Sequence, residues 1–420
     1  MTKKSDAPAI RFKGFSDAWE QRKLGDMMNV TSVKRIHQSD WTDSGVRFLR
    51  ARDIVAAAKN EEPDDYLYIS KEKYEEYSAL SGKVGVSDLL VTGVGTIGVP
   101  YLVRNLEPLY FKDGNIIWFQ NSDKIDGKFL FYSFSAEQIQ GFINESAGIG
   151  TVGTYTIESG KKTPISLPNQ IEQAKVGEFF QQLDNLITLH QRKFEKLTNV
   201  KKSMLEKMFP QNGNSYPEIR FKGFTDPWEQ RKLASLCEKF TDGDWIESKD
   251  QSDFGVRLVQ TGNVGVAEYL DKPNNKKWIS EDTFDRLHCE EVLPGDILIS
   301  RLPEPAGRAC IMPLLSTKMI TAVDCTIVRT APDMSNKFLV QYLSSQAYFD
   351  DVNTCLAGGT RQRISRGNLA NFNVPIPVKK TEQDAIGMFF GYLDNLITLH
   401  QRELEKLQNI KKSMLEKMFV

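Results

Sequence analysis

Cysteine is absent from the first 236 residues of this 420-residue chain, and the five cysteines that follow include no Cys-x-x-Cys pair. Their odd number argues against a disulfide scaffold and the missing Cys-x-x-Cys pair against a zinc ribbon, so we expect reduced thiols in a cytoplasm. No run of about 18 apolar residues occurs, which argues against a membrane span. The N-terminus, MTKKSDAPAIRFK, lacks the apolar core of a secretory signal. The net charge of −1 gives no basic total, although a nucleic-acid face needs only local positive potential.

Signatures of catalysis are also scarce. Gly93–Gly98 fits the pattern G-x-G-x-x-G, but a dinucleotide site needs a helix to open at the last glycine. The β-like Val99–Val103 follows instead, so we interpret the glycines as a turn between strands. Gly160-Lys161 lacks the rest of a phosphate loop, and no Asn-Pro-Pro-aromatic tetrapeptide of an amino-methyltransferase occurs. The four histidines do not indicate a metal site. We expect a chain that binds rather than catalyses, with no cofactor or metal of its own.

Two stretches of the sequence occur twice, roughly 210 residues apart. The opener Ile10–Leu24 (IRFKGFSDAWEQRKL) returns as Ile219–Leu233 with changes only at 16/225 and 18/227. Leu183–Phe209 returns as Leu393–Phe419 with changes only at 193/403, 194/404, 198/408 and 200/410. The sequence between the copies diverges. This pattern indicates a fixed frame that carries two interchangeable readers.

Two long helices are expected at the ends of the halves. Pro-rich joints at 163–168 and 373–377 end the preceding domains, and the proline-free stretches Glu172–Phe209 and Glu382–Phe419 follow. Apolar residues recur there with a period near 3.5, which predicts an antiparallel coiled coil rather than two ordinary amphipathic core helices. One His and one Lys interrupt each stripe and can fix the register. The predicted stripes are Leu183, Ile187, His190, Phe194, Leu197, Lys201, Met204 and Met208, and Leu393, Ile397, His400, Leu404, Leu407, Lys411, Met414 and Met418.

The middles share faint landmarks, which predict one fold used twice. Gly45-Val-Arg47 matches Gly255-Val-Arg257, and a helical stretch is expected from Lys128 to Gly150-Thr151 and again from Lys337 to Gly359-Thr360. We therefore predict two α+β domains with a twisted sheet, separated by the two long helices packed as an antiparallel coiled coil in a pseudo-twofold arrangement. The predicted boundaries are 1–24, 25–168, 169–210, 211–233, 234–377 and 378–420.

The strongest binding signal lies between residues 358 and 368, where arginine and glutamine side chains match phosphates and base edges. For any one residue a solvated or ion-paired surface role is about as plausible, but as a cluster they favour DNA contact. The candidates there are Thr360, Arg361, Gln362, Arg363, Arg366 and Asn368; in the corresponding region of the first half they are Thr151, Thr154, Tyr155, Lys161 and Lys162; and beside the glycine turn they are Arg301, Arg308 and Arg104.

The repeated segments resemble the conserved regions of the specificity subunits of type I restriction–modification systems. The resemblance rests on IRFKGF-x-D-x-WEQRKL, on LDNLITLHQR-x-x-EKL-x-N-x-KKSMLEKMF, and on the Glu-Gln that follows each joint, Glu172-Gln173 and Glu382-Gln383. It implies a non-catalytic DNA-binding subunit whose middles are target-recognition domains. Each would read one half of a bipartite, asymmetric double-stranded DNA target, and the helices would set the spacer between the half-sites.

The resemblance also implies partners and a closed frame. Two modification subunits carrying S-adenosylmethionine would dock on the repeats and methylate an adenine in each half-site, and restriction/translocase subunits using ATP and Mg would join. No membrane partner is expected. The opener would pack near the C-terminal helix, giving a circular pseudo-twofold frame. Two alternatives stay open: a duplicated coiled-coil adaptor between proteins without nucleic acid, and, less favoured, a nucleotide-using enzyme built on Gly93–Gly98.

Overall fold

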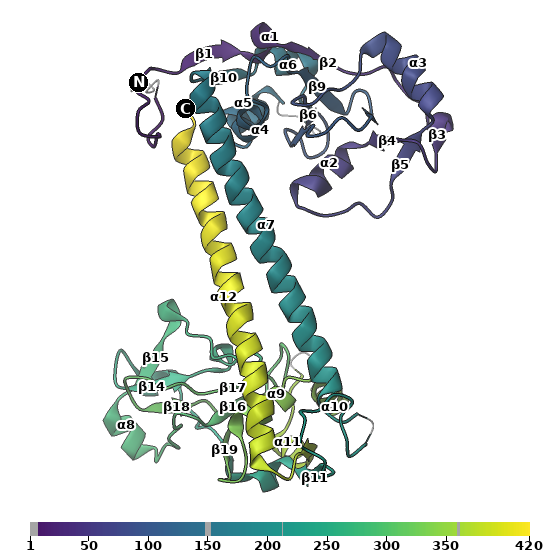
Figure 1. Cartoon of the computed structure of the whole chain (residues 1–420). Helices are drawn as coiled ribbons and strands as arrows, with labels where there is room; N and C mark the ends of the chain where they lie inside the picture. The colour runs from purple at the N-terminus through teal and green to yellow at the C-terminus, as the bar shows by residue number, and fades with distance from the viewer. Residues whose placement is uncertain (1–6, 148–152, 212, 359–361) are drawn as a thin grey trace. The chain divides into compact units, whose positions relative to one another are not determined.

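The computed structural model describes residues 7–147, 153–211, 213–358 and 362–420. The chain divides into two units, Met1–Arg192 with Gln401–Val420 and Lys193–His400, here called the first and second unit. Each unit combines an opener, a middle domain, one part of the helix α7 and one part of the helix α12 (Figure 1).

The two long helices are α7 (Gln170–Lys207) and α12 (Lys380–Met418), which confirms the predicted helices to within two residues at each end. Their sequences contain no proline, so the backbone hydrogen bonds continue without a break. α7 starts where the Asn169 side chain accepts a hydrogen bond from the Glu172 N–H at 3.0 Å, which satisfies one of the unpaired donors of the first turn. The antiparallel packing of α7 on α12 occurs inside both units.

Two ion pairs join α7 to α12. In the second unit Lys201 lies 2.5 Å from Asp394, and in the first unit Lys411 lies 2.6 Å from Asp184. The two lysines that interrupt the predicted stripes therefore face a carboxylate of the opposite helix. A charged pair at one position of an apolar seam favours a single register, as the sequence suggested.

The predicted stripe faces the interior. Leu183, Leu393 and Leu404 are buried, while the two histidines, His190 and His400, are half-buried. In the first unit Leu407 and Met414 pack with the core that contains Leu183; in the second, Leu197 and Met204 pack with the core that contains Leu393. Ile187, Phe194 and Ile397 are half-buried.

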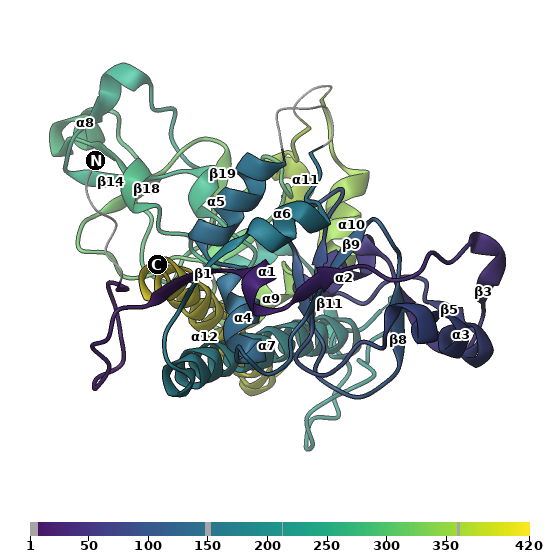
Figure 2. The same cartoon turned by 90° about the horizontal axis from the view of Figure 1, so that it is seen from above.

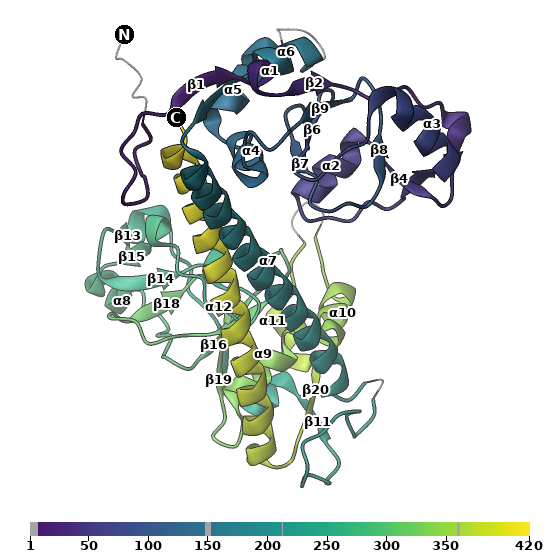
Figure 3. The ribbon, with the colours of Figure 1, turned by 45° about the horizontal axis from the view of Figure 1, so that its top comes forward.

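Each opener forms a strand that pairs with a Pro-rich joint. β1 (Glu20–Lys23) is antiparallel to β10 (Pro164–Leu167), and β11 (Glu229–Lys232) is antiparallel to β20 (Asn373–Ile376). Proline removes a backbone donor, but a two-stranded sheet leaves one side of each strand unpaired, so the prolines are tolerated there. Figure 3 shows β1 close to the start of α7 and the end of α12 in the first unit.

An aromatic cluster seals the opener to the helices in the first unit. The Phe419 ring lies 6.3 Å from Trp19, 5.4 Å from Phe129 and 5.7 Å from Phe180, measured between ring centroids. The Ile10 N–H also donates to the carbonyl of Lys417 at 2.9 Å. These contacts confirm that the N-terminal opener packs on the end of the C-terminal helix.

The second unit repeats this cluster with a different part of the chain. Phe209, at the end of α7, lies 6.0 Å from Trp228, 5.3 Å from Phe338 and 6.1 Å from Phe390. The Ile219 N–H donates to Lys207 at 2.9 Å. Each opener is thus held by the end of the long helix from the other half of the sequence.

A buried ion pair clasps each opener to the start of a long helix. The Arg11 guanidinium donates to both oxygens of Glu172 at 2.6 and 2.7 Å, and Arg220 donates to both oxygens of Glu382 at 2.7 and 2.9 Å. The Glu172 and Glu382 side chains are 0% and 2% exposed. In the second clasp the Trp228 indole N–H also donates to Glu382 at 3.3 Å. The Trp19 indole N–H finds no acceptor among the described residues.

The middle domain of the first unit contains two four-stranded sheets where the sequence predicted one. One sheet is antiparallel in the order β2-β9-β6-β7; the other has the order β3-β5-β4-β8, with β4 and β8 parallel. The strands are β2 (Asn29–Thr31), β3 (Trp41–Thr42), β4 (Val46–Leu49), β5 (Leu67–Ile69), β6 (Leu89–Thr92), β7 (Pro100–Leu102), β8 (Leu109–Phe111) and β9 (Ile116–Gln120). Gly93–Gly98 joins antiparallel β6 and β7, which confirms the turn interpretation.

Short helices precede, connect and follow these strands. They are α1 (Leu24–Met27), the 3-10 helix η1 (Gln38–Asp40), α2 (Ala51–Ala58), α3 (Lys71–Ser81), α4 (Gly127–Ser133), α5 (Glu137–Ser146) and α6 (Ile157–Lys162). The stretch expected to be helical from Lys128 is therefore divided between α4 and α5. Figure 2 shows α6 beside α1. A Cβ at Gly25 would lie 2.9 Å from Lys161, so this close approach needs glycine.

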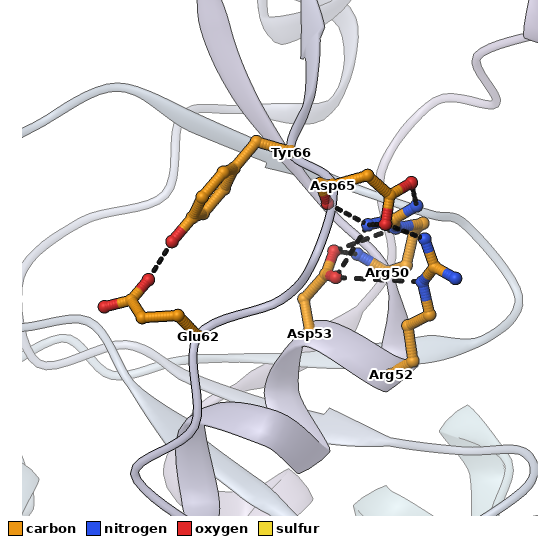
Figure 4. A network of polar contacts seen from close by, with 6 residues as sticks. All are labelled: Arg50, Arg52, Asp53, Glu62, Asp65 and Tyr66. Carbon is orange, nitrogen blue, oxygen red and sulfur yellow. Dashed lines mark hydrogen bonds and ion pairs between the residues drawn. The ribbon is translucent and has the colours of Figure 1, made fainter. Parts of the chain in front are cut away.

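The first turn of α2 is fixed by a charged network (Figure 4). Arg50 donates to both oxygens of Asp53 at 2.9 and 3.0 Å and to Asp65 at 2.9 Å, while its backbone N–H donates to Asp53 at 2.8 Å. Arg52 is also paired with Asp65. The carboxylate of Asp53 at the helix N-terminus satisfies an unpaired donor and complements the helix dipole.

The middle domain of the second unit has the same two strand orders, β12-β19-β16-β17 and β13-β15-β14-β18. The strands are β12 (Cys237–Asp242), β13 (Gln251–Ser252), β14 (Val256–Val259), β15 (Lys277–Ile279), β16 (Ile297–Ser300), β17 (Ala309–Ile311), β18 (Met319–Thr321) and β19 (Cys325–Thr330). The helices are η2 (Leu233–Leu236), η3 (Ser248–Asp250), η4 (Thr261–Asn263), η5 (Pro273–Asn275), α8 (Glu281–Arg286), α9 (Asn336–Tyr342), α10 (Gln346–Thr354) and α11 (Arg366–Asn371). One fold is used twice, as the landmarks predicted.

None of the helices in the described part of the chain is both long and apolar enough to cross a membrane.

Candidate functional site

Three segments meet at one end of the antiparallel sheet in the second unit. The Arg301 N–H, just after β16, donates to the carbonyl of Asp324 at 2.9 Å, and the Arg301 carbonyl accepts from the Ile364 N–H at 3.1 Å. Ala357 and Arg363 exchange two backbone hydrogen bonds at 2.9 and 3.1 Å. The predicted arginine-rich segment is therefore attached to the sheet by backbone bonds that do not depend on its side chains.

The first unit contains the same arrangement of backbone contacts, which is called the frame in both units. The Gly93 N–H, just after β6, donates to Asn115 at 2.8 Å, and the Gly93 carbonyl accepts from the Tyr155 N–H at 2.8 Å. A Cβ at Gly93 would lie 2.6 Å from the Tyr155 carbonyl oxygen. Gly93 thus takes the place of Arg301, Asn115 that of Asp324, and Tyr155 that of Ile364.

Among the described residues of this frame in the second unit, Arg363 and Arg366 are exposed cations. The Arg363 side chain is 62% exposed and lies 3.9 Å from Asp324, while the Arg366 side chain is 46% exposed and lies 3.8 Å from Asp242. These separations are longer than a charge-assisted hydrogen bond. The carboxylates orient the guanidinium groups and leave most of their N–H donors available to another acceptor.

The other predicted residues of this segment have mixed roles. Gln362 is exposed. Asn368 is exposed, but its side-chain amide donates to the Cys355 carbonyl at 3.3 Å, and its backbone N–H donates to the Ser365 hydroxyl, the N-cap of α11, at 3.0 Å. Thr360 and Arg361 lie outside the described residues.

Arg308 and Arg301 are not available to a ligand, so these two predicted contacts need correction. Arg308 is 9% exposed and donates to the carbonyls of Thr261, Val264, Leu302 and Pro305 at 2.6–3.0 Å. Burial lowers the pKa of its guanidinium. Arg301 is 8% exposed; it donates to the Val323 carbonyl and lies 3.5 Å from Asp242. Both arginines hold turns together from inside the domain.

The first unit presents lysines and hydroxyls where the second presents arginines. Thr154 is exposed in the place of Arg363, and α6 takes the place of α11. Lys161 and Lys162 are exposed in the last turn of α6, with Lys161 paired to Glu158 at 2.8 Å. The lysine lowers the pKa of the Glu158 carboxyl. Thr151 lies outside the described residues.

Tyr155 belongs to the core, which corrects its predicted contact with a ligand. It is 2% exposed, and its hydroxyl is hydrogen-bonded to the Thr163 hydroxyl at 2.5 Å. Burial raises the pKa of the Tyr155 phenol well above its usual range. Its counterpart Ile364 is 0% exposed, so this position anchors the segment in both units.

Arg104 lies at the wrong end of its hairpin for the predicted role. The register pairs Leu89 with Leu102, so Arg104 follows the end of β7 that is remote from the Gly93–Gly98 turn. Arg104 is bonded to Gln181 of α7 and lies 5.6 Å from the Phe131 ring centroid. It lines a cleft of about 580 Å³ between the middle domain and the helices of the first unit.

Asp242 and Asp324 belong to the site, although no motif in the sequence marks them. Asp242 ends β12 and also accepts from the Thr326 hydroxyl at 2.9 Å. Each lies far along the chain from the arginine that it orients. Their position at strand ends was a weak signal, and only the sheet order brings them to the arginines. Across the described ranges, no group of three or more His, Cys, Asp or Glu side chains is arranged to hold a metal ion.

Comparison with known families gives two matches within the chain. The sequence profile described as the type I restriction modification DNA specificity domain matches residues 16–199 and residues 225–409. Together these two segments include most of both units.

Comparison with individual proteins agrees with the profile. The putative type I restriction enzyme MjaX specificity subunit of Methanocaldococcus jannaschii is 25% identical over 416 residues, which cover 94% of this chain and 92% of that protein. The MjaVIII specificity subunit of the same organism is 27% identical over 200 residues, so the match spans only 44% of each protein. The crystal structure of a type I restriction–modification S subunit from M. genitalium covers 99% of both chains with a TM-score of 0.63 and 13% identity, which shows a shared fold.

Proposed function

The chain belongs to the type I restriction–modification DNA specificity family, and from this membership we propose that each unit reads one half of a bipartite double-stranded DNA target. The chain is the DNA-recognition subunit of such a complex and leaves catalysis to other subunits. The observation that carries the two-reader proposal is the pair of matching frames. Arg301, Asp324 and Ile364 make the same backbone contacts as Gly93, Asn115 and Tyr155, while the side chains presented next to them differ.

The proposed contacts are the exposed residues of these frames. In the second unit they are Gln362, Arg363 and Arg366, and in the first they are Thr154, Lys161 and Lys162. Thr360, Arg361 and Thr151 lie outside the described residues and are proposed as contacts from the sequence alone. Arginine forks can bind guanine edges or phosphates with two hydrogen bonds, whereas lysine is a compact point charge. We therefore expect the two half-sites to differ in sequence.

The helices have a separate proposed role. The near-identical halves of α7 and α12 offer the same surface twice, which suits two copies of one partner. We propose that two modification subunits carrying S-adenosylmethionine dock there, that restriction/translocase subunits using ATP and Mg complete the complex, and that this chain uses no cofactor itself. The stiffness of the helices would fix the spacer, because a flexible linker would not hold the rotational phase of two half-sites. Membership of this family argues against the alternative function as a protein–protein adaptor without nucleic acid.

Exchange of one middle domain tests the two-reader proposal. Residues 25–162 would be replaced by the equivalent segment of another family member, with both openers and both long helices unchanged. In cells that carry the modification partner, sequencing of methylated adenines should show a new first half-site, an unchanged second half-site and the same spacer. A change in both half-sites would refute the proposal. Exchange of residues 234–371 is the matched control and should alter only the other half-site.

A further inference from the structure

One large aromatic side chain near the arginines of the second unit is exposed. Trp245 is 72% exposed, whereas Trp19, Trp118 and Trp228 are each 3% exposed or less. A tryptophan offers roughly 150–250 Å² of contact surface, and a binding partner that covers it gains much of the associated free energy. An isolated exposed apolar residue needs no explanation by itself, so the way Trp245 is held and the groups around it decide its role.

The backbone before Trp245 is fixed to the sheet. The N–H groups of Gly243 and Asp244 donate to the carbonyls of Cys325 and Thr321, both at 2.9 Å, and the Asp244 carbonyl accepts from Val323 at 2.9 Å. The Asp244 carboxylate accepts from the Glu290 N–H at 2.9 Å. A Cβ at Gly243 would lie 2.3 Å from the Thr321 carbonyl oxygen, so glycine is required for this approach. Trp245 is therefore presented from an ordered segment.

The same contacts bring Trp245 to the end of the sheet that carries the exposed arginines. Asp242, three residues before it, lies 3.8 Å from Arg366. Val323, which donates to Asp244, precedes Asp324, which lies 3.9 Å from Arg363. The nearby acid Glu247 is paired with Lys249 at 2.8 Å, so it adds little net negative charge next to the indole.

The equivalent position in the first unit carries a cation. The 3-10 helices η1 and η3 correspond, because His37 and Glu247 each donate a backbone N–H to an aspartate three residues later, at 3.1 and 3.3 Å. Two residues before these caps lie Arg35 and Trp245. The Arg35 side chain is 70% exposed and lies 3.3 Å from Asp113. Both units therefore present a long exposed side chain at this position.

Resting on the proposed function, we infer that Trp245 is a DNA-contacting residue of the second unit, where its indole packs against the sugars and bases of that half-site. The contact is apolar, in contrast to the ionic contacts of Arg363 and Arg366. The difference provides a test, because ionic contacts release counterions and weaken steeply with salt, whereas an apolar contact does not.

The test uses the whole chain assembled with its modification subunits and a duplex that carries the methylated target. Affinity is measured over a range of salt concentrations for the wild type, Trp245→Ala, Trp245→Phe and Arg363→Ala. Trp245→Ala should weaken binding by roughly ten-fold at every salt concentration and leave the slope against salt unchanged. Trp245→Phe should recover part of the loss. Arg363→Ala should reduce the slope.

A matched control comes from Phe254, which is 82% exposed in the same unit. Phe254 precedes β14 and lies at the end of that strand remote from Val259. Val259 pairs with Thr321, which accepts a hydrogen bond from Asp244, so the Trp245 segment lies at the other end of β14. Phe254→Ala should leave the affinity unchanged. If Trp245→Ala has no effect while Arg363→Ala weakens binding, or if Phe254→Ala costs as much as Trp245→Ala, the inference about Trp245 fails and the proposed function stands. If the wild-type complex shows no preference for the target, the proposed function fails as well.

Discussion

Arg50 and Asp53 of the first unit occupy the places that Gln260 and Asn263 occupy in the second. Both pairs make the same turn: the Arg50 N–H donates to Asp53 at 2.8 Å, and the Gln260 N–H donates to Asn263 at 3.0 Å. One pair is ionic and is followed by the eight-residue helix α2; the other is neutral and is followed by three residues of 3-10 helix. The hydrogen bond of the turn has been kept, while the charge of the pair and the helix have changed.

Throughout both units, the backbone contacts are shared while the polar side chains differ. The clasps, the aromatic clusters around Phe419 and Phe209 and the frame contacts of Gly93 and Arg301 are equivalent, whereas the polar side chains around them differ. Backbone hydrogen bonds and apolar packing define the fold, and neither depends on which polar groups point outward. A protein built in this way can change its recognition surface without changing its frame.

The largest expected effect comes from breaking the clasps. Removing one partner of a buried ion pair leaves an uncompensated charge, so we expect Glu172→Ala and Glu382→Ala each to destabilise their unit by about 3–5 kcal/mol. Hydrogen exchange of the amides in β1–β10 and β11–β20 would report each unit separately. Glu382→Ala should cost more, because the Trp228 N–H also loses its acceptor. Equal protection in both sheets after either change would contradict this assignment.

A smaller loss of unfolding free energy is expected from replacing Arg308, an arginine that only the second unit has. The Arg308 guanidinium donates hydrogen bonds to four backbone carbonyls, and the corresponding residue of the first unit is Val99. Arg308→Met should destabilise the second unit by roughly 3 kcal/mol, because buried carbonyl groups lose their donors. Arg104→Met, a change of an exposed arginine in the first unit, is the control and should alter the unfolding free energy little. DNA affinity should be unchanged once the variant is folded, since Arg308 does not reach the surface.

Exchanging the charged and neutral residues of the two turns tests whether the turns are interchangeable. Asp53→Asn should cost about 1–3 kcal/mol, because the largely buried Arg50 keeps only Asp65 as its ionic partner. Asn263→Asp should also destabilise, since a carboxylate would face the Leu270 carbonyl that now accepts from the Asn263 amide at 2.8 Å. Adding Gln260→Arg should recover part of that loss. Thermal unfolding of the three variants measures this, and no recovery would mean that the turns are not interchangeable.

The smallest effect concerns the buried Asp88 and depends on pH. Asp88 accepts from the Gly85 N–H, the Trp118 indole and the Asn121 N–H, whereas the corresponding Asp296 accepts from the Leu293 N–H and is ion-paired with Arg329. Burial raises the pKa of the Asp88 carboxyl. The unfolded chain therefore loses this proton at lower pH than the folded chain, and stability is lost as the pH rises through the raised pKa.

Asp88→Asn removes that titration. At pH 4 the unfolding free energy of the variant should be about 1–2 kcal/mol below that of the wild type, because the amide does not replace one hydrogen bond of the acid. This difference in unfolding free energy should become smaller towards pH 7. Chemical unfolding monitored by hydrogen exchange of first-unit amides would measure the difference in unfolding free energy at both pH values. A deficit that grows with pH would contradict the raised pKa.

Local pattern was sufficient to predict the parts of the fold that depend on neighbours in the sequence. The helices, their stripes and the turn at Gly93–Gly98 follow from spacing and composition. The strands formed by the joints did not, because β10 finds its partner β1 about 145 residues earlier, and the prolines indicated only that no helix forms there. The division of each domain into two sheets likewise depends on long-range pairing.

The candidate site shows the same limit. Arg363 and Arg366 were chosen by residue type and are exposed, but Arg301 and Arg308, chosen for the same reason, point inward. The direction of a side chain depends on strand register, and a shift of one residue would reverse it. Arg104 was placed beside the turn from its position in the sequence, yet the antiparallel register carries it to the opposite end of the hairpin.

The exchange of helix ends between the units has a consequence for synthesis on the ribosome. The second unit consists of one uninterrupted stretch, Lys193–His400, whereas the first needs Gln401–Val420 as well. Translation therefore delivers every piece of the later unit before the earlier one can close. Until Phe419 emerges, Trp19, Phe129 and Phe180 lack the ring that they surround, so the nascent first unit exposes an apolar surface that is prone to aggregate.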